Sequence, residues 1–290
     1  MQIMNYQEQY KKDGYLYKFK AFDDLRAKKL VEEFNINFKN HLRPNFLIKQ
    51  ELLYKIHLVY KSFNDVVREE KILEIVREIL GKNIVCWNSL LFYKKKSKFV
   101  TFHQDLKYWK FLNEDCLTVS LALTKSTIDN GCLIAIPGSH INEENHLKKY
   151  SPNNLLANYQ SINVEGRKKK FFELDPGEFS IHHGNIVHGS YENKTNDDRI
   201  LLAIRYAKDD NLSKIYHSAT YINKKPGLFE REPLCKKNFD NDSIKFREKL
   251  LRIQYEVYFK KKYKLLSKIG LYHLASNKII RLVYNYFFKK

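Results

Sequence analysis

Two metal-binding side chains, an imidazole and a carboxylate, stand two residues apart at His103 and Asp105. On a β-strand such a pair leaves the same face, so we expect both to bind one metal ion. With a second histidine they would hold Fe(II) on one side and leave positions open for oxygen and a co-substrate. His188 is our candidate for that third ligand. A His-x-Asp pair alone is a weak signal in a chain with ten histidines.

An arginine follows the candidate third ligand at a useful spacing. Arg199 is eleven residues beyond His188. If His188 ends one strand and Arg199 begins the next, the guanidinium returns toward the metal at the distance of one small molecule. Arginine binds carboxylates through two parallel hydrogen bonds, and Ser190 would add a hydroxyl donor to the same anion. These residues predict a site for an anionic co-substrate.

The hydrophobic pattern predicts helices first and strands afterwards. We expect a strand over 15–19, then helices over about 24–34, beginning at Asp23 or Asp24, over about 49–68, and over 69–80 with Gly81 as its stop. From residue 84 the period changes to two, which predicts strands over 84–93, 116–123, 131–136, 171–174, 178–182 and 199–206. Many short strands indicate a closed or two-sheet β structure with helices on one outer face.

Two further segments stand out. The polar stretch 140–170 is long for a loop in a compact domain, which predicts a lid or substrate loop. Beyond residue 209 the pattern becomes helical again, and 243–259 is amphipathic with mixed charge. We therefore expect two domains, a catalytic domain over 1–240 and a basic helical tail over 241–290.

The bulk properties narrow the classes of protein. No apolar run is long enough to span a membrane, and the polar N-terminus does not resemble a secretory signal. The four cysteines form no Cys-x-x-Cys pair, which predicts reduced thiols in a cytoplasmic protein. The net charge of +19 favours an anionic partner, namely nucleic acid, an acidic membrane face or an anionic substrate. A biased genome composition is an equal alternative.

The last segment, 257–290, holds nine Lys or Arg residues and no acid. A basic helix with apolar residues opposite is suited to peripheral contact with an anionic membrane. Packing of that face on the domain or on a second subunit is the alternative.

Five sequence blocks occur in a fixed order. They are His103-Gln104-Asp105, Asn130-Gly131-Cys132-Leu133, Ile136-Pro137-Gly138-Ser139-His140, Pro176-Gly177-Glu178, and His188-Gly189-Ser190 followed by Asn193 and Arg199. In these blocks the chain resembles the phytanoyl-CoA dioxygenase family of Fe(II)/2-oxoglutarate oxygenases, over roughly 13–208. Five blocks in order are far more specific than any one of them.

The resemblance implies an α+β fold with a double-stranded β-helix, or jelly-roll, core. It implies Fe(II) bound by His103, Asp105 and His188. It also implies that 2-oxoglutarate places its far carboxylate on Arg199 and Ser190, with Gln104 as a further contact. With O2, such an enzyme hydroxylates an aliphatic C–H bond of a small or lipid-linked substrate and releases succinate and CO2.

Two departures from the family pattern bear on the chemistry. Relatives often carry a tryptophan where this chain has Ser120 and Leu121, so that wall of the co-substrate site is expected to differ. Halogenating relatives replace the carboxylate ligand by Ala or Gly, so Asp105 favours hydroxylation.

Several residues near the site have two interpretations. Tyr108 and Trp109 would line the substrate pocket or pack in the core. Arg205, on the same strand face as Arg199, would bind an anionic substrate group or pair with a buried acid. Lys94 belongs to a charged run expected to be a solvated hairpin, or a cation that steers an anion at the site mouth.

Three other histidines are weaker candidates for the metal. Only one of the adjacent His182 and His183 can face inward on a strand, and Arg199 fits the spacing from His188. His140, at the end of its Pro-Gly-Ser-His turn, is expected to fix a loop by a hydrogen bond.

A second hypothesis is a non-catalytic, membrane-surface or anion-binding module on a jelly-roll scaffold. Nucleic-acid binding is not expected, because the cations are not interleaved on a recognisable recognition fold. The identity of the substrate, the use of a CoA thioester and the oligomeric state do not follow from the sequence.

Overall fold

The computed structural model describes residues 5–40, 53–109, 115–156, 160–209, 218–222, 227 and 229–262. The chain divides into two compact units, Met1–Asp240 and Asn241–Lys290, each described by itself. The described part of the second unit is one helix, α6 (Asn241–Lys262), where the sequence predicted an amphipathic segment. Most of the basic tail lies outside the described residues. None of the helices in the described ranges is both long and apolar enough to cross a membrane.

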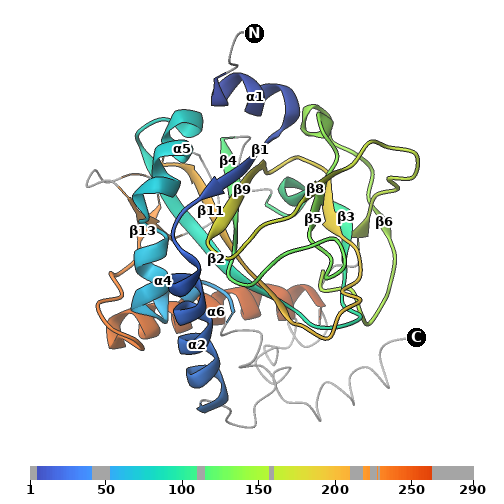
Figure 1. Ribbon diagram of the computed structural model, residues 1–290. Coiled ribbons are helices and arrows are strands. Elements are labelled where there is room, and N and C mark those ends of the chain that lie inside the picture. The colour runs from blue at the N-terminus through green and yellow to red at the C-terminus, as the bar shows by residue number, and fades with distance from the viewer. Residues whose placement is uncertain are drawn as a thin grey trace. The chain divides into compact units, whose positions relative to one another are not determined.

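The described part of the first unit is built on two larger β-sheets, with a further two-stranded sheet of β6 (Leu147–Lys148) and β7 (Gln160–Ser161) (Figure 1). The larger sheet has the strand order β1 (Tyr15–Lys20), β9 (Glu178–His183), β4 (Cys116–Ala122), β11 (Arg199–Lys208), β2 (Ile84–Lys94), β12 (Ser218–Tyr221) and β13 (Glu230–Arg231). The smaller sheet has the order β3 (Val100–His103), β10 (His188–Ser190), β5 (Leu133–Ala135) and β8 (Lys170–Phe172). Neighbouring strands in both sheets are antiparallel except β12 and β13, and strands distant in sequence lie side by side.

Strand β11 shows how the larger sheet separates two environments. Its residues Arg199, Leu201, Ala203 and Arg205 line a cavity, because alternate side chains share one face. Tyr206 points the other way, and its hydroxyl donates a hydrogen bond to the carbonyl of Val67 at 2.9 Å. One face of the strand therefore faces the cavity and the other the helical layer.

The α-helices of this unit within the described residues are α1 (Tyr6–Asp13), α2 (Asp24–Asn40), α4 (Lys61–Val66) and α5 (Glu70–Leu80). In Figure 1, α2, α4 and α5 lie on the side of the larger sheet away from β3, β5 and β8. Helix α5 buries Ile72 and Val76 on one stripe and ends where the N–H of Gly81 reaches the carbonyl of Arg77 at 2.8 Å. Asp23 caps α2 by accepting from the N–H of Arg26 at 2.8 Å. The predicted layer of helices on one face is confirmed.

The prediction of one continuous helix over about 49–68 is wrong. Residues 41–52 lie outside the described ranges, and the rest contains a short 3-10 turn, η1 (Ile56–Leu58), followed by α4. Lys55 has a φ of +47°, which an α-helix does not accommodate. The predicted loop 140–170 contains a small hairpin, β6 (Leu147–Lys148) with β7 (Gln160–Ser161), and begins with η3 (Ser139–Ile141).

The unusual backbone at Lys55 belongs to a buried polar cluster at the edge of the larger sheet. Glu232 is ion-paired with Lys55, and its second oxygen lies 2.9 Å from Nε2 of His57. The hydroxyls of Ser218 and Thr220 donate to the same carboxylate at 2.7 and 2.8 Å. Burial raises the pKa of Glu232, but Lys55 and His57 outweigh burial and lower it to about 2. The cluster ties the η1 segment to β12.

We predict that Glu232→Gln destabilises the protein by about 3 to 5 kcal/mol, because it leaves the buried Lys55 ammonium without its counter-charge. Urea unfolding at neutral pH measures the change. The exposed Glu165→Gln is the control and should shift stability by less than about 0.5 kcal/mol. Equal unfolding midpoints for the two variants would contradict the structural role of the cluster.

The same carboxylate gives a pH dependence with a defined sign. Because the folded pKa of Glu232 is about 2 and its ordinary value is 4.5, its contribution is fully present above pH 4.5. Stability is then lost as the pH falls from 4.5 toward 2. We expect unfolding curves of Glu232→Gln to lose part of this acid sensitivity.

Candidate metal centre

The two candidate histidine ligands face each other across paired strands. His103 ends β3 and His188 begins β10, and the two are direct partners in the antiparallel register. Their ring centroids are 4.3 Å apart. His103 Nδ1 lies 2.8 Å from the carbonyl of Thr101, and His188 Nδ1 lies 3.0 Å from that of Ile186. These contacts orient both rings so that Nε2 is left for a metal.

The carboxylate ligand comes from the turn after β3. Asp105 begins a 3-10 helix, η2 (Asp105–Lys107), so the prediction that both residues lie on one strand is wrong. Its Oδ1 is 3.3 Å from His103 Nε2 and its Oδ2 is 3.9 Å from His188 Nε2. One ligand atom from each of the three residues lies within 4.8 Å of the others. His188 likewise begins its strand, although the sequence predicted that it ends one.

The charges of these groups suit a metal ion. Burial raises the pKa of Asp105, but the Arg205 guanidinium and the two histidines outweigh it and hold that pKa well below its usual range. Burial lowers the pKa of His188 to about 4, and the neighbouring His103 contributes a smaller part of the lowering. At neutral pH the site therefore offers a carboxylate and a neutral imidazole at these positions, which are the forms that bind metals. Two imidazoles and one carboxylate are the donor set preferred by non-heme Fe(II).

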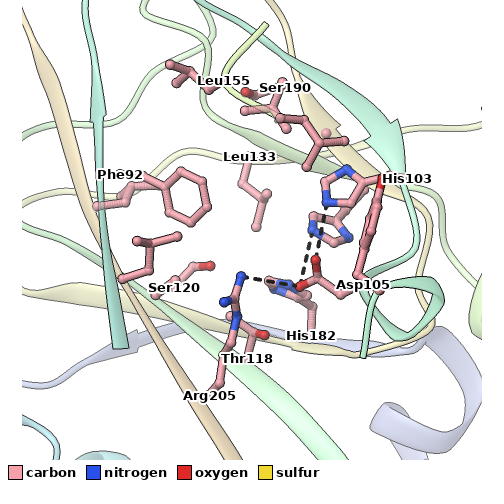
Figure 2. Close-up of a pocket in the computed structure, with 18 of the residues that line it drawn as sticks. Phe92, His103, Asp105, Thr118, Ser120, Leu133, Leu155, His182, Ser190 and Arg205 are labelled. Atoms are coloured by element: carbon pink, nitrogen blue, oxygen red, sulfur yellow. Dashed lines mark ion pairs between the residues drawn. The ribbon is translucent and has the colours of Figure 1, made fainter. Parts of the chain in front are cut away.

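The three ligands line a cavity of 290 Å³ whose walls come from both sheets. Figure 2 shows His103 and Asp105 on one side of it and Phe92 opposite. Apolar side chains make up much of the wall, among them Leu90, Phe92, Leu133, Leu155 and Leu201. Ser120, on the strand where the resemblance led us to expect a different wall, also lines this space.

Arg199 provides a buried cation in the same cavity. It is 3% exposed, and its Nε and Nη1 have no hydrogen-bond partner among the described residues. Burial lowers its pKa to about 10, so it remains charged at neutral pH. Ser190 also lines the cavity. A guanidinium with unused donors is well suited to bind a carboxylate.

Lys94 was expected in a solvated hairpin or at the mouth of the site, but the structure buries it beside Arg199. It is fully buried at the end of β2, directly opposite Arg199 in the register. Its Nζ donates to the carbonyl of Gly131 at 3.0 Å, to Ser190 Oγ at 2.8 Å and to the carbonyl of Tyr191. Burial lowers the pKa of Lys94 to about 6, and the positive charge of Arg199 contributes a smaller part of the lowering. The alternation of side chains along the strand could have predicted this inward position. Leu90 and Phe92 face the cavity, and Lys94 is the next residue on the same face of the strand.

Gln104 lies outside the cavity wall. Its side-chain amide donates to the carbonyls of Asn142 and Asn185, each at 2.7 Å, and accepts from the N–H of Glu144 at 2.8 Å. These bonds engage both ends of the amide with loop backbone. Gln104 therefore fits a role in holding the loop after η3, in place of the predicted co-substrate contact.

The three predicted substrate contacts lie together. Tyr108, Trp109 and Arg205 all line the cavity. The Trp109 ring also packs in the core against Trp87, with centroids 4.8 Å apart. The Arg205 guanidinium lies 3.9 Å from Asp105 Oδ2, which corresponds to the predicted pairing with a buried acid.

The other histidines occupy separate places. His182 faces the cavity with its ring centroid 4.6 Å from that of His188, whereas His183 faces the opposite side of β9 and packs against His140. Burial holds the pKa of His182 well below its usual range. His140 Nε2 lies 3.0 Å from the carbonyl of Lys11, in agreement with a loop-fixing role.

Two antiparallel sheets enclosing a buried site of two histidines and one carboxylate define a jelly-roll protein of the non-heme metal type. A family model described as phytanoyl-CoA dioxygenase (PhyH) matches residues 10–201, which is more than half of the chain. The chain belongs to this family.

Curated relatives match over part of their length. A probable alpha-ketoglutarate-dependent hypophosphite dioxygenase of Stutzerimonas stutzeri is 31% identical over 165 residues, covering 53% of this chain and 56% of the relative. The peroxisomal phytanoyl-CoA dioxygenase of Homo sapiens is 26% identical over 149 residues, covering 48% of this chain and 44% of the relative. The chain thus spans about half the length of these two relatives.

Solved structures agree with the fold. The non-heme monooxygenase ThoJ in complex with nickel superposes with a TM-score of 0.74 at 23% identity, covering 88% of this chain and 99% of that chain. The crystal structure of EctD from S. alaskensis with 2-oxoglutarate and 5-hydroxyectoine gives 0.56 at 19% identity, covering 78% and 86%. The predicted double-stranded β-helix is confirmed.

Gly131 allows Lys94 to approach the backbone closely, and a substitution at this position tests that requirement. Its φ is +72°, and a Cβ there would collide with the carbonyl of Tyr191 and with Lys94 Nζ. Gly166 has a nearly equal φ of +71° with no atom near its missing Cβ. We predict that Gly131→Ala loses more stability in urea unfolding than Gly166→Ala, by at least about 1 kcal/mol, because only Gly131→Ala adds crowding to the backbone strain. Equal losses would contradict this.

Proposed function

We propose that this chain is an Fe(II)/2-oxoglutarate-dependent dioxygenase that hydroxylates an aliphatic C–H bond of a small or lipid-linked substrate, with release of succinate and CO2. The observation that carries the proposal is that the three candidate metal ligands line one cavity with Arg199, whose Nε and Nη1 have no hydrogen-bond partner among the described residues. The relatives named as alpha-ketoglutarate-dependent and phytanoyl-CoA dioxygenases support it.

His103, Asp105 and His188 would hold the iron. When bound, Fe(II) supplies the activation of O2 that oxidises 2-oxoglutarate and hydroxylates the substrate. Nδ1 contacts to backbone carbonyls keep the two imidazoles in the orientation that presents Nε2. Asp105 contributes the negative charge and is held ionised by Arg205.

Arg199 and Ser190 would bind the far carboxylate of 2-oxoglutarate. The guanidinium presents Nε and Nη1, which have no partner in the described part of the chain. Lys94 orients the Ser190 hydroxyl by donating to its oxygen, which leaves the hydroxyl hydrogen for the anion. The surrounding leucines and Phe92 exclude water and so strengthen this charge pairing.

The first prediction for the proposed activity concerns the metal ligands. We expect succinate to form from 2-oxoglutarate in the presence of Fe(II) and O2, and the rate to fall at least about 100-fold in His103→Ala, Asp105→Ala and His188→Ala. Metal binding by each variant, measured by calorimetry with Ni(II), should fall in parallel. The surface variant Lys96→Gln is the control. Succinate formation that survives these alanine substitutions would contradict the assignment.

The second prediction separates the co-substrate from the metal. Replacing Arg199 by Gln removes charge-assisted hydrogen bonds worth about 1.5 to 3 kcal/mol, so the KM for 2-oxoglutarate should rise by about 10- to 100-fold. Metal affinity should stay unchanged. Arg167→Gln, which removes a loop arginine paired with Glu144, is the matched control. An unchanged KM in Arg199→Gln would count against the predicted co-substrate site.

A cytoplasmic protein with peripheral membrane contact through 257–290 remains a proposal that rests on sequence. The nine basic residues and absence of acids in that segment support it. We expect the full chain to co-sediment with phosphatidylserine vesicles in a salt-sensitive way, and a chain lacking 257–290 to remain in solution while still forming succinate. Vesicle binding without succinate formation would favour the non-catalytic alternative.

A further inference from the structure

Buried polar atoms that lack a hydrogen-bond partner gather around Arg205. Within the described ranges they include Thr118 Oγ1, both ring nitrogens of His182 and Nε of Arg205. All three residues line the cavity (Figure 2), Thr118 pairs directly with Arg205 in the strand register, and we refer to them as the Arg205 end. A buried polar atom that stays unsatisfied costs about 1 to 3 kcal/mol, so several at one place point to a ligand that satisfies them together.

The guanidinium of Arg205 is held in position by aromatic rings. Its central carbon lies 4.6 Å from the ring centroid of Trp109 and 5.7 Å from that of Trp87. Its Nη2 is 3.9 Å from Asp105 Oδ2, which is an ion-pair distance and longer than a hydrogen bond. A guanidinium has five N–H donors in a plane, and Nε of Arg205 has no hydrogen-bond partner among the described residues. The rings thus hold a cation that still has a donor available.

The Arg205 end and the proposed co-substrate end are different places. Figure 2 shows Ser190 and Leu155 at one side of the cavity, and Arg205, Thr118 and His182 at the opposite side. In the same view, the side chains of His103 and Asp105 lie between these two sides of the cavity. A ligand on Arg205 would therefore approach the metal from the side opposite the Ser190 contact.

The charges of the cavity favour an anion at the Arg205 end. Arg199, Arg205 and Asp105 are the charged side chains among its described lining residues, apart from the histidines. With Fe(II) and the 2-oxoglutarate dianion bound, their charges would cancel, and Asp105 would balance one guanidinium. One positive charge would then be left uncompensated in the cavity, which is unfavourable where the dielectric constant is low.

We propose that the Arg205 end binds an oxyanion of the substrate, a carboxylate or a phosphonate, with Arg205 and Thr118 as hydrogen-bond donors. The inference rests on the proposed function, and it narrows the substrate to a small anionic molecule. Because Arg205 lies 3.9 Å from an oxygen of the metal-binding Asp105, an anion bound there is close to the metal. The C–H bond that reacts is therefore only a few bonds away from the anionic group.

The test is a calorimetric titration of the full chain loaded with Ni(II) and saturating 2-oxoglutarate. The probes are methylphosphonate and propionate, which separate the two oxyanion sources, and propionamide, a neutral analogue of propionate. We expect one oxyanion probe to bind at least about tenfold more tightly than propionamide, as a charge-assisted pair requires. Binding of neither oxyanion above the level of propionamide would overturn the inference.

The variants locate the binding. Arg205→Gln should weaken the preferred oxyanion at least about tenfold, and Thr118→Val, which leaves the Asp105 contact intact, about threefold or more. Lys96→Gln should bind it as the wild type does. If Arg205→Gln loses its metal, Thr118→Val decides the question. Wild-type affinity in both Arg205→Gln and Thr118→Val would overturn the inference.

Failure of the inference and failure of the proposed function give different results. If Arg205→Gln weakens 2-oxoglutarate as strongly as Arg199→Gln does, Arg205 serves the co-substrate and the inference is wrong while the dioxygenase proposal stands. If the wild type binds no 2-oxoglutarate, the proposed function fails. The oxyanion titration is then repeated on the metal-free chain, where loss of binding in Arg205→Gln would still support an oxyanion site.

Discussion

The site depends on the burial of one carboxylate among groups that favour its negative charge. Asp105 is 5% exposed, and water contributes little to its solvation. Its two oxygens instead face the Nε2 atoms of His103 and His188, with Arg205 close to the second oxygen. Removing any of these neighbours raises the cost of the buried charge. The same arrangement brings a carboxylate and two imidazoles within 4.8 Å of one another, a group that could hold a metal ion.

The rigidity of this arrangement comes from the two sheets. Strand pairing sets His103 opposite His188, and the short η2 turn brings Asp105 back to them. The polar groups of the loops are satisfied elsewhere, as the amide of Gln104 illustrates by bonding to backbone on both sides of its loop. Among the described residues, several buried polar atoms without a hydrogen-bond partner belong to side chains that line the cavity, including those of Thr118, Arg199 and Arg205. Such atoms are available to a bound molecule.

The cavity has an asymmetric chemical character that follows from one strand. Arg199 and Arg205 share the inward face of β11, separated by the smaller and apolar Leu201 and Ala203. The proposed co-substrate uses the first guanidinium, with Lys94 and Ser190 beside it. The second guanidinium lies by the metal carboxylate and between two indole rings. A strand with cations at both ends of an apolar stretch suits two anionic molecules that meet at the metal.

The residue types and the order of the sequence blocks predicted the family and the candidate metal ligands, and a period of two predicted that Arg199 and Arg205 share one face of a strand. Strand register and burial were decided by the tertiary structure alone. Lys94 looked like part of a solvated run until its pairing opposite Arg199 removed it from water. Gln104 looked like a site residue until the loops around it took up its amide. Such outcomes depend on neighbours more than 30 positions away, and local spacing carries no information about them.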